Sequence, residues 1–500
     1  MTSRSVIMPV LVLAAWAVAA SVAMAQEDNR DEAKEGFPES YTAESAGTAP
    51  ATAWWMELGD PRLNELIEQG LEQNPNLSAA RERVVASKAQ ATGSLAPLLP
   101  HASVELGLKR TSIEFKNLDE GEYPVTSGGS SASSSSGGSS FSSTNFDDPI
   151  VTDSGSAYLV GNWQLDVFGK NAFAYAANRK EALASQGDRD ADAASLAASI
   201  AGAYYDVIAA RAKVRAVEKQ IQANQKMLDL MQLRFETGVA SGLDVLQQKQ
   251  VLASSKTRLP NTRLELRLAE QTLATLLNQQ PTQTVAIDAD ALPEIPALER
   301  LDEPEALPSN RPDVEASYER MRAARNRKYS AIGGFLPTLT VTGQYGQERP
   351  DYDVDQVNEI WFVGAGLSIP IFQGGSNIAT YRANAANYRA ARQDYRALQL
   401  TAVRRVEAAV ARDREMHEAL TAYQGQFEAA QAALDQSTER YLTGLTDYVS
   451  VLAAINAKQA AELSVIQTHR QMIDARLALY DAVGGAWMND LSMPAKDDES

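Results

Sequence analysis

Hydrophobic side chains recur every seven residues along two very long stretches of the chain. The first stretch carries one row at Ile200, Val207, Val214, Ile221, Leu228 and Phe235, and a second row at Ala203, Ala210, Val217, Asn224 and Met231. The second stretch carries Val406, Asp413, Leu420, Phe427, Leu434 and Tyr441, with Asp413 as a polar exception. A sustained seven-residue period predicts long helices that supercoil against their neighbours. The first should run from about 171 to 235, which corresponds to about 100 Å.

A similar turn follows each long helix. It reads RFETGVASGLDVL at 234–246 and RYLTGLTDYVSVL at 440–452. Gly238 and Gly444 stand where a helix ends in a left-handed residue. A second heptad row, at Val245, Leu252, Leu259, Leu266 and Leu273, then predicts a return helix. We therefore expect two long antiparallel hairpins with these turns at their tips, and a kink or a junction at Pro260.

Four shorter segments alternate between apolar and polar or small residues. They are VELGLKRTSIEF (104–115), SAYLVGNWQLDVF (156–168), TLTVTGQYGQ (338–347) and IWFVGAGLSIPIF (360–372). Each pair is preceded by a predicted helix, at 62–94 and at 311–333. The period of two predicts strands, and their lengths suit tilted strands that cross a bilayer.

The same order of elements occurs twice, which indicates an internal repeat. The copies lie 237 residues apart at Pro100 and Pro337, but 204 apart at Phe168 and Phe372. The first half therefore holds an insertion between its two strands. The serine- and glycine-rich tract 127–143 lies there, and it is predicted to be a flexible, dispensable external loop.

These features divide the chain into six parts. They are a signal peptide (1–25), an extended segment (26–60), the first repeat (61–281), a linker (282–308), the second repeat (309–485) and a C-terminal tail (486–500). The signal peptide has Arg4 before an apolar run and a small-x-small site at Ala23–Ala25. A retained N-terminal anchor is the alternative. No later segment has eighteen consecutive apolar residues, so any membrane crossing is expected to use strands.

Composition excludes several classes of function. The chain has no cysteine and three histidines, which argues against thiol chemistry and a histidine metal site. Its formal charge of −18 argues against nucleic acid as a partner and would favour cations in a water-filled passage. No phosphate-binding loop or catalytic constellation is present in the sequence, so neither an enzymatic activity nor a cofactor is predicted. Asp188, Asp190 and Asp192 are interpreted as a solvated helix face.

Four strands leave two open sheet edges, which lipid does not tolerate. The smallest known membrane barrels have eight strands. The predicted barrel must therefore be shared between chains, and three copies would supply twelve strands. The expected fold class is mixed α and β, with a trimeric twelve-stranded barrel that continues into a long helical barrel.

The chain resembles the trimeric outer-membrane efflux channels, the TolC-like family, over nearly all of its mature length. The resemblance is carried by WWMELGDPRLNELIEQGLEQNPNL (54–77), WQLDVFGK (163–170), the two tip turns and AVGGAW (482–487). The first of these looks most like the branch that serves resistance–nodulation–division pumps. Many members of that branch begin with a lipidated cysteine, which this chain lacks.

The resemblance implies a passive exit duct in the outer membrane, in contact with its lipid. Its implied partners are two further copies of the chain, a periplasmic adaptor and an inner-membrane pump. In the family the tip turns dock the adaptor, which corresponds here to Thr237, Gly238, Val239, Ala240, Thr443, Gly444, Leu445 and Thr446. The same residues can equally serve as ordinary helix caps.

The family closes its inner end with acidic and apolar rings at the tips. The resemblance assigns this role to Asp244 and Val449, with Tyr441 near the turn as a hydrogen-bonding partner. Two further acidic positions of the family are Ser450 and Ala453 here, so Asp447 is a candidate substitute. Asp244 could instead be only a helix-start residue favoured by the helix dipole.

Tyr158, Trp163 and Trp361 are interpreted as aromatic side chains at the membrane interface. Two other functions stay open at this stage. One is the exit duct of a type I protein-secretion system, and the other is a periplasmic coiled-coil scaffold without a channel.

Overall fold

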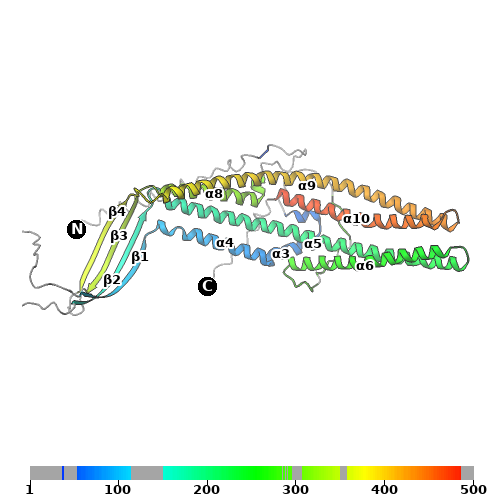
Figure 1. The fold of residues 1–500 in the computed structure, drawn as a ribbon, viewed down its shortest axis with the longest axis horizontal. Coiled ribbons are helices and arrows are strands. Elements are labelled where there is room, and N and C mark those ends of the chain that lie inside the picture. Colours follow the sequence, from blue (N-terminus) through cyan, green and yellow to red (C-terminus); the bar gives the residue numbers. More distant parts are fainter. Residues whose placement is uncertain are drawn as a thin grey trace, which may run out of the picture. The chain divides into compact units, whose positions relative to one another are not determined.

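The computed structural model describes residues 37–38, 53–113, 150–283, 285–287, 289, 291–295, 307–349 and 357–485 (Figure 1). The expected signal peptide, the tract 127–143 and the C-terminal tail lie outside these residues. The chain divides into two compact units. Of the described residues, one unit contains those within 93–173 and 329–378, and the other contains the rest.

The first unit is built on one four-stranded antiparallel sheet. Its strands are β1 (His101–Ile113), β2 (Ile150–Leu165), β3 (Thr338–Arg349) and β4 (Asn358–Ser368), in the order β1-β2-β3-β4. The four strands predicted from the period of two are therefore confirmed. Within the described residues, the outer edges of β1 and β4 pair with no strand.

The register collects the apolar side chains on one face of the sheet. Val104 is opposite Leu159, Leu159 is opposite Tyr345, and Tyr345 is opposite Trp361. Their neighbours two residues along each strand lie on the same face, so Leu106, Leu108, Trp163, Val363 and Leu367 belong to it as well. Trp361 is 74% exposed and Leu108 is 84% exposed. A row of exposed large apolar side chains across four strands is not typical of a water-facing sheet.

The second unit contains two helical hairpins. The first hairpin is α5 (Lys170–Glu236) with α6 (Gly242–Leu276), and the second is α9 (Ser376–Leu442) with α10 (Tyr448–Val483). Both α5 and α9 have 67 residues, which confirms the predicted long helices. The return helix α6 continues through Pro260, so the junction considered at that residue is absent. Figure 1 shows each return helix beside the last part of its long helix.

Shorter helices precede the strands. They are η1 (Trp54–Leu58), α3 (Pro61–Gln73), α4 (Pro75–Gly93), η2 (Ala96–Leu98), α7 (Leu307–Asn310) and α8 (Pro312–Gly333). The single helix expected at 62–94 is wrong, because Asn74 divides it into α3 and α4. Asn74 has an extended backbone, and its side-chain oxygen accepts from the backbone N–H of Asn76 at 2.9 Å. It thus caps α4 directly before Pro75, a residue that favours the first turn of a helix.

The heptad rows of the sequence form the helical core. All members of the row Ala203, Ala210, Val217, Asn224 and Met231 are buried. Ala203 packs in a cluster with residues of α6, α10 and the η1–α3 segment, and Met231 packs in a second cluster with residues of α6, α9 and α10. By length and composition alone, α5 and α10 each contain an 18-residue window that is apolar enough to cross a membrane. The search of the sequence for eighteen consecutive apolar residues did not find these windows. Core helices pass the same test; 61% of the window in α5 is buried, and 22% of the window in α10.

The described part of the linker between the two halves is held by side chains aimed at its carbonyl oxygens. Arg62 donates to Ala286 O at 3.0 Å, and Arg211 donates to Ile287 O at 2.9 Å. His469 on α10 contacts Pro293 O at 2.9 Å, and His417 on α9 contacts Ile295 O at 3.0 Å. These contacts attach the linker to helices of both halves.

Candidate functional site: the hairpin tips

The two tips close with the same set of backbone hydrogen bonds. At the first, Val239 N–H donates to Arg234 O at 2.8 Å, and Gly238 N–H donates to Phe235 O at 3.0 Å. At the second, Leu445 N–H donates to Arg440 O at 2.8 Å, and Gly444 N–H donates to Tyr441 O at 3.1 Å. This pair of bonds is the Schellman motif, which needs a left-handed residue at its centre. Gly238 has φ 74° and Gly444 has φ 76°.

A threonine completes each cap. The hydroxyl of Thr237 donates to Leu233 O at 3.1 Å, and that of Thr443 donates to Glu439 O at 3.1 Å. The repeated letters R-x-x-T-G of the sequence therefore correspond to one local structure. It ends the helix, and it leaves Val239 and Leu445 at the tips with 64% and 69% of their surface exposed.

The two tips are joined by Tyr441 on α9. Its hydroxyl donates to an Asp244 carboxylate oxygen on α6 at 3.3 Å, and it lies 3.4 Å from the Met231 sulfur. The Arg234 guanidinium lies over the Tyr441 ring at 5.0 Å and donates to Leu442 O at 3.4 Å. Burial and the Asp244 charge raise the pKa of Tyr441, which stays a neutral donor. These hydrogen bonds and the cation–π contact thus link the tip of the first hairpin to the tip of the second.

Asp244 is also a helix-start residue. It lies in a capping box, in which Asp244 N–H donates to the Ser241 hydroxyl at 3.2 Å and Ser241 N–H donates to the carboxylate at 3.3 Å. The two interpretations of Asp244 are therefore compatible. One carboxylate caps α6 and accepts a bond from the other hairpin.

Asp447 and Ser450 form the corresponding cap of α10. The Asp447 carboxylate accepts from Ser450 N–H at 3.1 Å and from the Ser450 hydroxyl at 2.7 Å. These bonds hold the pKa of the exposed Asp447 carboxyl below its usual value. Val449, beside them, is 55% exposed. Serine at position 450 thus serves the cap where the family's pattern has an acid.

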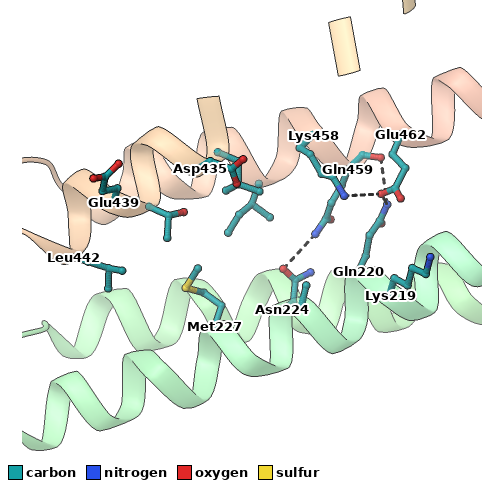
Figure 2. A pocket seen from close by; sticks show the side chains of 14 residues that line it. Lys219, Gln220, Asn224, Met227, Asp435, Glu439, Leu442, Lys458, Gln459 and Glu462 are labelled. Atoms are coloured by element: carbon teal, nitrogen blue, oxygen red, sulfur yellow. Dashed lines mark hydrogen bonds and ion pairs between the residues drawn. The ribbon is translucent and has the colours of Figure 1, made fainter. Parts of the chain in front are cut away.

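A groove of about 590 Å³ separates the two hairpins above the tips. Its walls carry apolar side chains from α5, α9 and α10, among them Met227, Leu434 and Ile455, and charged side chains that include Glu439 on α9 and the Lys458–Glu462 pair on α10, whose charged atoms are 3.1 Å apart. Figure 2 shows Glu439 toward one end of the groove and Lys458 and Glu462 toward the other. Among the described residues, no cluster of three or more histidine or acidic side chains could hold a metal ion.

The three predicted interface aromatics do not share one face of the sheet. Trp163 and Trp361 belong to the apolar face, and Trp163 donates to Leu98 O at 3.0 Å. Tyr158 is opposite Glu105 and donates to Glu348 at 3.1 Å, so it lies on the polar face. Its assignment with the two tryptophans is corrected by the register, because a shift of one residue along a strand reverses the face.

Sequence reasoning missed the residues that bridge the hairpins above Tyr441. Tyr448, Gln248 and Gln459 are buried and hydrogen-bonded between α6, α10 and α5. A usable signal was present in Asn224, a polar member of an otherwise apolar heptad row. Polar residues at core positions of coiled coils often specify partner and register.

A family model described as outer membrane efflux protein matches residues 66–279 and 304–485. The pyoverdine export outer membrane protein OpmQ of Pseudomonas aeruginosa is 28% identical over 473 residues, covering 92% of this chain and 94% of the relative. The toluene efflux pump outer membrane protein TtgC of Pseudomonas putida is 25% identical, covering 90% and 88%.

Among solved structures, the outer-membrane channel OprN superposes with a TM-score of 0.78 at 24% identity, covering 90% of this chain and 95% of that one. The outer membrane protein VceC of Vibrio cholerae has a TM-score of 0.74 at 24% identity, covering 88% and 100%. These superpositions show the shared fold. Since the family model matches most of the chain in both halves, the protein belongs to the outer membrane efflux protein family.

Proposed function

We propose that the protein is the exit duct of a tripartite efflux system. Three copies form a twelve-stranded barrel in the outer membrane, and their hairpins form a helical tube in the periplasm. The duct passively exports small molecules that an inner-membrane pump hands over through a periplasmic adaptor. The names of the relatives, which concern pyoverdine export and toluene efflux, support small compounds rather than proteins as cargo.

The observation that carries this proposal is the sheet. Its two outer strands have unpaired edges within the described residues, and its apolar face is exposed. Both features are unfavourable in a monomer, because open edges and apolar faces promote association. Closure with two further sheets satisfies the edges, and lipid covers the apolar face.

The proposed role of the tips is to dock the adaptor. Val239 and Leu445 are exposed apolar side chains on rigid caps, and the groove above them has the apolar lining and charged rim that suit a helical partner. Tyr441 and Asp244 are proposed to hold the entrance closed in the resting duct, with Val449 and Asp447 beside it.

Disulfide trapping tests the shared barrel, since the natural chain has no cysteine to interfere. Ser103→Cys on β1 is combined in turn with a cysteine at Phe362, Gly364 or Gly366 on β4. Three positions on β4 are needed because the register between chains is not fixed by one sheet. Oxidation in membranes should give covalent trimers for at least one pair, whereas either single cysteine should give dimers at most.

Transport is tested in a strain that lacks the gene. The deletion should raise sensitivity to a panel of drugs, metals and detergents, and the intact gene should restore resistance. Covalent trimers without any change in sensitivity would support the fold but contradict the efflux role. Secretion of a protein that depends on this gene would favour the type I duct instead.

A further inference from the structure

The two hairpins share a buried polar network above their tips. Its members come from α5, α6 and α10, and each is at most 5% exposed: Asn224, Gln248, Ser255, Tyr448 and Gln459. Long amide and phenol side chains rarely stay buried unless their polar atoms are paired. In this network the side-chain polar atoms are hydrogen-bonded to one another or to a backbone carbonyl.

Within the first hairpin, Asn224 is bonded on two sides. Its amide nitrogen donates to the Ser255 hydroxyl at 2.7 Å, and its backbone carbonyl accepts from the Gln248 amide at 2.7 Å. These bonds tie α5 to α6. They leave the side-chain oxygens of Asn224 and Gln248 available to the second hairpin.

The second hairpin donates a hydrogen bond to each of these two oxygens. Gln459 donates to the Asn224 side-chain oxygen at 3.2 Å, and the Tyr448 hydroxyl donates to the Gln248 side-chain oxygen. A third link lies at the groove wall, where Gln220 donates to Glu462 at 3.0 Å (Figure 2). If α10 moves away from α5 and α6, these buried acceptors lose their donors and must be solvated again. Such a loss is unfavourable, so the network resists separation of the hairpins.

The network adjoins the Tyr441–Asp244 bond. Tyr448 is the first residue of α10, and its ring lies 5.4 Å from that of Tyr441. Two layers of polar contacts therefore join the hairpins, one at the tip and one in the core behind it. They are carried by different residues and can be removed separately.

We propose that Tyr448, Gln248, Asn224 and Gln459 form a second latch, which sets how readily the entrance of the duct opens. The proposal rests on the exit-duct function, since an entrance exists only in the trimer. A movement of the second hairpin away from the first must break both layers, whereas loss of one layer leaves the other to hold the closed state.

The competing explanation is that the network only fixes the register of the helices, as polar core residues do in coiled coils. A register device affects folding and trimer yield. A latch affects the fraction of time that an intact trimer conducts. The experiment must therefore measure conduction on trimers of normal stability.

The primary variant is Tyr448→Phe, which removes one hydroxyl and keeps the ring. In planar bilayers its open probability should rise about two- to tenfold, the range that the net contribution of one hydrogen bond allows. Tyr441→Phe should act similarly, and the double variant should open more than either single variant, with a departure from the product of the two increases because the two rings are in contact. Gln225→Met is the matched control, since Gln225 is bonded only to Asp229 on the same helix and outside the network.

A second variant separates latching from stability. Tyr448→Phe with Gln248→Met removes donor and acceptor together; it also removes the Gln248 bond to the Asn224 carbonyl, which keeps its partner inside helix α5, so thermal stability should return part of the way toward wild type. If its open probability stays raised, the latch is supported. If open probability returns to the wild-type value with stability, or if Tyr448→Phe never changes it in intact trimers, the network is a register device and the proposal is wrong. Trimers that carry no current in the wild type or in any of these variants would contradict the exit-duct function itself.

Discussion

Arg476 on α10 and Asp413 on α9 form a two-bonded ion pair inside the helical unit. Arg476 Nε donates to one carboxylate oxygen at 2.9 Å and Nη2 donates to the other at 3.0 Å. Both side chains are 4% exposed. The pair explains why the heptad row of α9 contains an aspartate, since the charge is matched at the same level of the neighbouring helix.

Removing one member of this pair should be far worse than removing both. Asp413→Leu alone removes the carboxylate that neutralises a buried guanidinium, at a cost of about 3–5 kcal/mol. Asp413→Leu with Arg476→Met replaces the pair by apolar side chains and should be neutral or stabilising by about 1–4 kcal/mol. Thermal unfolding of purified protein in detergent measures both. Equal losses in the single and double variants would mean that the pair itself stabilises the fold.

The tip glycines should be required for their backbone conformation alone. No atom lies within 4 Å of a Cβ built on Gly238, so Gly238→Ala tests only the left-handed φ, at about 1–2 kcal/mol. Gly238→Asn should cost less, because asparagine tolerates this conformation. Gly425 is the matched control. It lies inside α9 with open space around it, so Gly425→Ala should stabilise by about 0.5–1 kcal/mol.

The spacing of apolar residues was sufficient to predict the long helices and the four strands, because a period of seven or of two recurs along each of them. The tips were predicted from the turn sequence that occurs twice. Asn74 shows where spacing alone fails. A single side chain that caps the next helix divides a helix which hydrophobic pattern alone continues from 62 to 94. Likewise Pro260 looked disruptive, yet α6 continues through it.

The buried polar contacts depend on pairing between residues that are far apart in the sequence. Asp413 stood out as a polar exception, but its partner Arg476, 63 positions away in the same hairpin, has no local signature. Gln248 and Tyr448 have none either, because their burial follows from how two hairpins meet. Tyr158 illustrates the remaining limit, since one residue of register decides whether an aromatic faces the apolar or the polar side of the sheet.

A charge at either tip should weaken transport without weakening the protein. Val239→Asp and Leu445→Asp change exposed side chains, so the free energy of unfolding should change by about 0.5 kcal/mol or less. They would place a charge in the proposed docking surface and should reduce drug resistance in cells. Val239→Thr and Leu445→Asn are the neutral controls. If trimer abundance falls together with resistance, the turns act only in folding.

Two partly buried carboxyls should give opposite pH effects on stability. Burial alone would raise the pKa of Asp313, but two hydrogen bonds from Arg311 and one from the Val314 backbone outweigh it and hold the pKa below its usual value. Burial raises the pKa of Asp190, and the adjacent Arg189 offsets this only in part. A depressed pKa stabilises the fold above the unfolded value of about 3.9, and this contribution is lost as the pH falls through the folded pKa. A raised pKa destabilises the fold once the pH exceeds that unfolded value.

At pH 7, Asp313→Asn should therefore lower the melting temperature and Asp190→Asn should raise it. The Asp190 difference from wild type should shrink as the pH falls toward about 4, whereas the Asp313 difference should largely persist at about pH 4 and be lost only as the pH falls further, through the depressed folded pKa. Melting curves from about pH 2 to pH 7, taken on the same preparations, supply the test. A difference that does not depend on pH would mean that size or hydrogen bonding, and not ionisation, sets the effect.

Asp244 should make the entrance selective for cations. In the proposed trimer three copies face one another across the axis, and their combined field attracts cations and binds multivalent ones. Asp244→Asn should abolish much of the cation selectivity in planar bilayers, and it should weaken the block by a trivalent cation added on the tip side. Ala453→Asp should deepen that block, because it adds three carboxylates where the family's pattern has them.

Two controls separate the charge of Asp244 from its other contacts. Tyr441→Phe removes the bond between the hairpins, and Ser241→Ala removes the cap of α6, while both retain the carboxylate. Both should keep the selectivity even where they change stability or open probability. If Asp244→Asn leaves selectivity and block unchanged, the carboxylate serves only the cap and the Tyr441 bond. The narrowest point then depends on Asp447, whose carboxylate is exposed at the other tip, and Asp447→Asn becomes the variant that should lose selectivity.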